Sequence, residues 1–175
     1  MRNNQILMQD IWLALVPIIL SIHIWSILHV LEELPAWILR LTMWELLGVI
    51  SYTQVFALFE SILTLVPFLV VRLFLPKRWL ANYFVPATGL IILVATSWAI
   101  VAHNYEQVLR TWGIREFLPW FLLVAISMIL AVVLVSRSEK VKNILVTLVN
   151  RATVLSAFYL FIDCLSLIIV LIRNI

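Results

Sequence analysis

The sequence contains few cysteines, few glycines and none of the common catalytic motifs. Cys164 is the only cysteine, so one chain forms neither a disulfide framework nor a cysteine-based metal site. Three glycines predict limited close packing of small residues between helices. The chain has no Gly-rich phosphate loop, no H-E-x-x-H pair and no serine nucleophile elbow. An enzyme is therefore the less favoured class of protein, although the question stays open at this stage.

Charged residues are scarce as well, at 12% of the chain, whereas hydrophobic residues make up 65%. A soluble domain is roughly 45–50% apolar and about 25% charged. A fold of 175 residues has too little interior to bury so much apolar surface in water. In a bilayer only helices and closed barrels satisfy their backbone, and the apolar runs lack the alternation of barrel strands. We expect an all-α integral membrane protein.

The apolar runs predict five transmembrane helices in one domain, residues 1–175. Each run is about 20 residues long, as a bilayer crossing requires. The spans fall near 11–31, 46–71, 81–103, 117–136 and 152–172. The first run is long, follows Asp10 and lacks an A-x-A exit, so it does not read as a cleavable signal. We find neither a lipidation motif nor an internal repeat.

The basic residues predict how these spans are oriented. Eight of the twelve Lys and Arg residues fall on the side of the N-terminus: Arg2, Arg72, Lys77, Arg78, Arg137, Lys140, Lys142 and Arg151. The other four are Arg40, Arg110, Arg115 and Arg173. The positive-inside rule then places the N-terminus inside and the C-terminus outside. The net charge of +3 reflects this loop bias, and we expect no nucleic-acid partner.

Prolines and one mixed segment predict local features of the helices. Leu34 precedes Pro35, which predicts that the first helix ends there. Pro17 and Pro67 lie inside spans and should kink them. Residues 137–151 mix Lys and Arg with Ile, Leu and Val, which is typical of an amphipathic helix at the inner surface that continues into the last span.

Two His/Glu turns stand at the outer ends of the first and third spans. They read His29-x-x-Glu32-Glu33 and His103-x-x-Glu106. Residues three or four apart share one face of a helix, so each turn offers an imidazole and a carboxylate at the same depth. These five side chains are candidate ligands for a divalent metal or candidate catalytic residues. Proton handling and a structural hydrogen-bonded cluster are the alternatives.

The first of these turns resembles a known signature. His29-Val30-Leu31-Glu32-Glu33, followed by Leu34-Pro35-Ala36-Trp37, is similar to the motif of the HXXEE-motif membrane proteins, and His103 matches their further histidine. The resemblance implies a small multi-pass protein of a bacterial cell membrane, with no assigned activity. It adds plausibility to the His/Glu site without naming a reaction.

Two acids lie near the middle of predicted spans, Glu60 in the second and Asp163 in the fifth. An acid at this depth costs about 2.5–3.5 kcal/mol on insertion scales. No Lys or Arg lies at the same depth, so each acid is expected to be protonated or paired with a group not evident from the sequence. One possibility is that their faces meet and that Tyr159 hydrogen-bonds to a carboxyl. Interhelical packing, proton transfer and docking of a partner are the competing roles.

His23 lies in the middle of the first span. An intramembrane histidine can ligate haem or the magnesium of a chlorophyll, so His23 is a weak cofactor-binding candidate. A bis-histidine haem needs a second histidine at the same depth, whereas His29 and His103 lie near the outer rim. This argues against a haem carrier and favours a hydrogen-bonded core histidine.

These observations leave three functional hypotheses. The favoured one is a non-catalytic accessory subunit that packs against other membrane proteins, or against copies of itself, in an energy-converting or pigment-containing complex. It rests on large apolar faces and on buried acids without internal partners. The second is a metal protein or enzyme that uses the outer His/Glu residues. The third is a proton-coupled carrier that uses Glu60 and Asp163.

Overall fold

The computed structural model describes residues 3–74 and 77–175, with side chains described from residue 8 onward except for residues 77–81. Every element in these ranges is a helix: α1 (Asn3–Ile38), α2 (Met43–Phe74), α3 (Lys77–Asn104), α4 (Glu106–Leu109), α5 (Ile114–Arg137) and α6 (Glu139–Asn174). Five of them are long and apolar enough to cross a membrane, which confirms the expected all-α, five-span class. Arg2 and the side chains of Lys77 and Arg78, which enter the orientation prediction, lie outside the described residues.

The two longest helices run past the spans predicted for them. α1 continues through Pro35 to Ile38, so the prediction that it ends at Leu34 is wrong. The missing N–H and the proline ring disturb only the last helical turns, where water at the rim can satisfy the freed carbonyl. α6 is one continuous helix from Glu139 to Asn174, so residues 139–151 are the first turns of the last spanning helix. At 36 residues each, both helices are about 54 Å long, well beyond a hydrocarbon core of about 30 Å.

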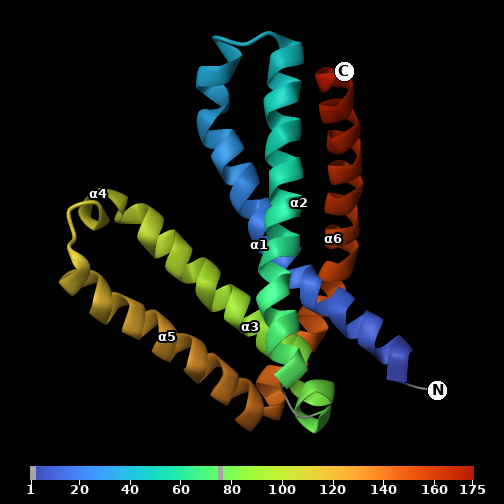
Figure 1. The fold of residues 1–175 in the computed structure, drawn as a ribbon, viewed down its shortest axis with the longest axis vertical. Helices are drawn as coiled ribbons and strands as arrows, with labels where there is room; N and C mark the ends of the chain where they lie inside the picture. The colour runs from blue at the N-terminus through green and yellow to red at the C-terminus, as the bar shows by residue number, and fades with distance from the viewer. Residues whose placement is uncertain (1–2, 75–76) are drawn as a thin grey trace.

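α1 is the central helix of the bundle. It packs against α2, α3 and α6, while α5 packs on α3 and touches α6. Figure 1 shows α2 and α6 side by side with the second half of α1, whereas α3 and α5 form an arm that diverges from them. α2 and α3 make few contacts with each other, although both lie against α1. A groove bordered by α1 and by these two helices is the candidate binding site described below.

Several small residues lie on the buried face of α2. Its buried residues are Gly48, Ser51, Gln54, Ala57, Ser61 and Leu65. Serine and alanine let helix backbones approach much as glycine does, so the glycine count alone leaves out small residues that lie on this face. On α6, Val149, Ser156 and Asp163 are buried at intervals of seven residues and share one face.

Polar contacts tie the helices together near their ends. The Asp10 carboxylate of α1 accepts a hydrogen bond from Arg72 of α2 at 3.0 Å, and both side chains are largely buried. The same guanidinium lies over the Phe84 ring of α3, 4.6 Å from its centre. This cluster joins three helices at one end of the bundle. In the diverging arm, the Trp98 indole of α3 donates to the Ser127 hydroxyl of α5 at 2.9 Å.

Candidate functional site

The middle of the bundle contains a buried pair formed by His23 of α1 and Asp163 of α6. Both side chains are fully buried. His23 Nε2 lies 3.0 Å from each Asp163 carboxylate oxygen, and Nδ1 lies 2.9 Å from the carbonyl oxygen of Ile19. Because a carbonyl only accepts, Nδ1 carries a hydrogen and donates to Ile19. A further proton must then lie between Nε2 and the carboxyl, on one group or the other.

This geometry bears on two predictions about the buried polar residues. Both ring nitrogens of His23 are engaged in hydrogen bonds, which favours the role of a hydrogen-bonded core histidine over that of a cofactor ligand. Asp163 has an internal partner, which is a histidine rather than a lysine or arginine. Tyr159 contacts the pair through its ring, whose centre lies 5.1 Å from that of His23. Close by, the Ser156 hydroxyl donates to the Val16 carbonyl at 3.3 Å, a second polar contact between α6 and α1.

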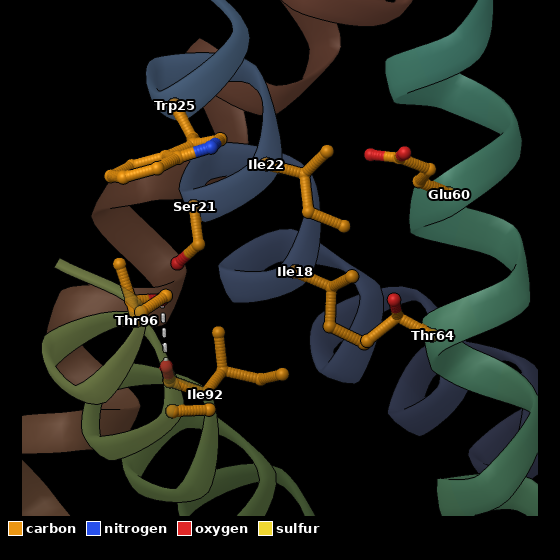
Figure 2. A pocket seen from close by; sticks show the side chains of 10 residues that line it. Ile18, Ser21, Ile22, Trp25, Glu60, Thr64, Ile92 and Thr96 are labelled. Atoms are coloured by element: carbon orange, nitrogen blue, oxygen red, sulfur yellow. Dashed lines mark hydrogen bonds between the residues drawn. The ribbon is translucent and has the colours of Figure 1, made fainter. Parts of the chain in front are cut away.

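Glu60 lies apart from that pair. Its side chain is exposed and lines a groove bordered by α1, α2 and α3 (Figure 2). No α6 residue lines this groove, so the expected meeting of the Glu60 and Asp163 faces does not occur there. Within the described residues Glu60 makes no hydrogen bond or ion pair. The two central acids therefore have different surroundings, one enclosed and paired, the other open.

The groove has a volume of about 230 Å³. Ser21 and Trp25 of α1, Glu60 and Thr64 of α2, and Thr96 of α3 supply its polar and aromatic groups, and the remaining lining is isoleucine and alanine. Figure 2 shows the Glu60 carboxyl extending from α2 toward α1. The Thr96 hydroxyl donates to the Ile92 carbonyl of its own helix at 2.8 Å. An apolar cleft with a few polar groups is the usual form of a small-molecule site.

At the rim the structure brings His29 and His103 together. Their ring centres are 5.3 Å apart and the rings are nearly perpendicular. Trp25 lies against both imidazoles, with ring-centre distances of 4.9 Å to His29 and 5.3 Å to His103. Glu32 Oε2 lies 3.4 Å from His29 Nδ1. The two His/Glu turns are thus neighbours, and the histidines of both contact Trp25, which lines the groove.

The other rim carboxylates do not complete a metal site. Glu106 binds Arg110, with Oε1 3.2 Å from Nε and 2.5 Å from Nη2. That hydrogen bond and the charge of Arg110 lower the pKa of Glu106 below its ordinary value. Glu33 is exposed. Among the described side chains no three His, Cys, Asp or Glu residues are grouped so that they could hold one metal ion, and the predicted five-ligand set is not assembled.

The fold and these sites define a helical, multi-span membrane bundle with one open carboxyl in its middle. No protein-family model, curated protein or solved structure matches the chain. What the protein does is therefore inferred from its own residues.

Proposed function

We propose that this protein is a small proton-coupled membrane carrier and that the groove around Glu60 is its binding site. One observation carries the proposal: a carboxyl near mid-membrane opens into a groove and has no partner within the described residues. Along α2, Glu60 lies about 26 Å from the start of the helix and about 21 Å from its end. Ionisable residues at this depth commonly mark an ion or substrate path.

The His23–Asp163 pair supports this function indirectly, by holding the floor of the groove. On α1, His23 faces α6, whereas Ser21 and Trp25 line the groove. The pair therefore anchors to α6 the same turns of α1 that form the groove floor. In this proposal Asp163 positions α1 and does not itself carry protons, so Glu60 alone exchanges them.

An accessory-subunit role is the alternative. From the sequence this role rests on large apolar faces and on buried acids without internal partners, and Asp163 has an internal partner in His23. The exposed apolar faces and Glu60 still support it, because a cationic side chain on a helix of another protein would satisfy Glu60 equally well. The proposed setting, a bacterial cell membrane with the N-terminus inside, is supported by the distribution of Lys and Arg and by the resemblance to HXXEE-motif proteins.

Proton flux in liposomes tests the carrier. With a pH gradient and an enclosed pH dye, the parent protein should dissipate the gradient, and Glu60→Gln should reduce the flux to that of protein-free liposomes. Glu139→Gln is the matched control, because Glu139 is exposed at the start of α6 and takes no part in the groove. Equal flux in the parent and in Glu60→Gln would exclude a Glu60-dependent carrier. A foreign chain that co-purifies with the parent but not with Glu60→Gln would instead assign the groove to a partner subunit.

A further inference from the structure

The chemistry of the groove limits what it can bind. Of the groups that line it, Glu60 is the only one that can carry a charge. A carboxylate in a low-dielectric environment is stable only with a proton or a cation close to it. The occupant that complements the ionised groove therefore carries a positive charge.

A metal ion does not fit this lining. Calcium takes six to eight oxygen ligands, and magnesium requires a near-ideal octahedron of them. Besides Glu60 the groove offers three hydroxyl groups, from Ser21, Thr64 and Thr96, which with the carboxyl give fewer oxygen ligands than either ion takes. The remaining lining is apolar side chains and one indole, which suit a cation that carries apolar groups.

Trp25 adds a second feature that suits an organic cation. Its ring lines the groove, and its contacts with His29 and His103 fix the ring from the rim side. The face of an indole attracts an ammonium group within about 6 Å of the ring centre, and more strongly where water is excluded. The groove thus combines a carboxylate, an aromatic face and isoleucine side chains.

We propose that the Glu60 groove binds a lipophilic organic cation, such as an aryl or alkyl ammonium, that enters from the lipid phase. This rests on the proposed carrier function and names its substrate class. The volume of about 230 Å³ accommodates the charged head and one ring, and it is smaller than a drug-sized pocket of about 300–1,000 Å³. A larger apolar tail extends into the surrounding acyl chains.

The cation and a proton compete for the Glu60 carboxyl. When Glu60 is protonated, binding requires that its O–H bond breaks and that the proton leaves to water, after which the carboxylate balances the charge of the cation. Binding therefore weakens as the pH falls. His29 and His103 contact Trp25 of the lining, and Glu32 and Glu106 flank these histidines at the rim.

Equilibrium dialysis in nanodiscs of zwitterionic lipid tests the proposal with radiolabelled phenyltrimethylammonium. Its neutral isostere, tert-butylbenzene, has the same shape without the charge. The parent should bind the cation saturably, and Glu60→Gln should weaken binding at least tenfold, whereas Glu139→Gln should leave it unchanged. Trp25→Leu should weaken binding more than Trp25→Phe. Binding of the neutral isostere should be the same in the parent and in Glu60→Gln.

The pH dependence separates Glu60 from the rim histidines. Lowering the pH until carboxyl groups are protonated should weaken binding by the parent and have no effect on the residual binding by Glu60→Gln. If the pH dependence persists in Glu60→Gln, the proton is not exchanged at Glu60. Equal binding by the two proteins, or none above empty nanodiscs, overturns the substrate class. If proton flux still depends on Glu60 in that case, the carrier stands with another cargo; if neither measurement depends on Glu60, both proposals fail.

Discussion

His23 Nε2 lies at 3.0 Å from both carboxylate oxygens of Asp163, although 140 residues separate them in the chain. Both side chains are fully buried. The pair joins α1 to α6 in the middle of the bundle and leaves the opposite side of α1 free to form the groove floor. It is thus a structural element on which the candidate site depends.

Breaking this pair should destabilise the protein strongly. His23→Leu leaves a buried carboxyl without its partner, which costs about 3–5 kcal/mol. The double variant His23→Leu/Asp163→Leu replaces the pair by apolar side chains and should recover most of that loss. The free energy of unfolding, measured by denaturant titration in mixed micelles, checks both. Tyr159→Phe is the control, because it keeps the ring contact with His23. Additive losses in the double variant would show that the two side chains do not act as a pair.

The Asp10–Arg72 contact should make a smaller contribution. Asp10→Asn keeps the shape and removes the charge that Arg72 binds at 3.0 Å. Hydrogen bonds to charged groups contribute about 1.5–3 kcal/mol, and the two side chains are only 20% and 10% exposed, so solvent screening is weak. The same unfolding titration checks the loss. Glu139→Gln, which removes the pair between the exposed Glu139 and the partly buried Lys142, should change stability by less than about 1 kcal/mol. Equal losses in the two variants would contradict this account.

Composition and spacing were sufficient for the coarse fold. Sixty-five per cent hydrophobic residues in five long runs determine a helical membrane bundle, because the bilayer leaves few other solutions. The His-x-x-Glu spacing placed His29 and His103 at one depth, and their rings are in contact. Both inferences depend only on local periodicity and on the direction of each span.

Which buried polar residues face each other could not be predicted from the sequence, because this depends on how the helices are rotated about their axes. His23, Asp163 and Glu60 all lie near mid-membrane, and only packing decides which two of them face each other. One interpretation of the sequence placed the two acids against each other. In the structure Asp163 pairs with His23, and Glu60 lies in the groove. A histidine at the same depth as an acid was the available signal. The small residues on the buried face of α2 were missed for another reason, because glycines were counted and the spacing of serine and alanine was not.

The effect of Gly48→Ala on stability should change sign when Arg173 is removed. A Cβ at Gly48 would lie 1.5 Å from Arg173 Nη1, which donates to the carbonyls of Trp44 and Glu45 at 3.2 and 3.3 Å. Gly48→Ala should therefore displace the guanidinium and cost about 0.5–1.5 kcal/mol in lost hydrogen bonds, partly offset by better helix formation. In an Arg173→Ala background the same change should stabilise by about 0.5–1 kcal/mol. Unfolding free energies of the four proteins test this, and equal effects of Gly48→Ala in both backgrounds would refute it.

Glu106 should titrate at an unusually low pH. The hydrogen bond and charge of Arg110 hold the pKa of Glu106 below its ordinary value of 4.5, and a positively charged His103 lowers it further. A depressed carboxyl pKa contributes stability above the ordinary value, and this contribution is lost as the pH falls through the lowered one. Carbon-13 NMR of labelled glutamate should follow this titration, and Arg110→Gln should raise the pKa toward 4.5. Arg115→Gln should leave it unchanged; an equal rise in both variants would mean that Arg110 has no specific role.

The contact between His29 and His103 requires that the ends of α1 and α3 lie on the same side of the membrane. Cysteines replacing the exposed residues Arg40 and Gln107, in a Cys164→Ser background, should therefore react with an impermeant maleimide from one side. Lys140→Cys, at the start of α6, should react only from the other, because α5 crosses between them. The excess of Lys and Arg on the side of the N-terminus predicts that positions 40 and 107 are labelled in intact cells and position 140 only in inverted vesicles. Labelling of 40 and 107 from opposite sides would contradict the fold itself. If all three positions are labelled from the side opposite to the predicted one, the five spans and the groove are preserved and only the proposed orientation is overturned.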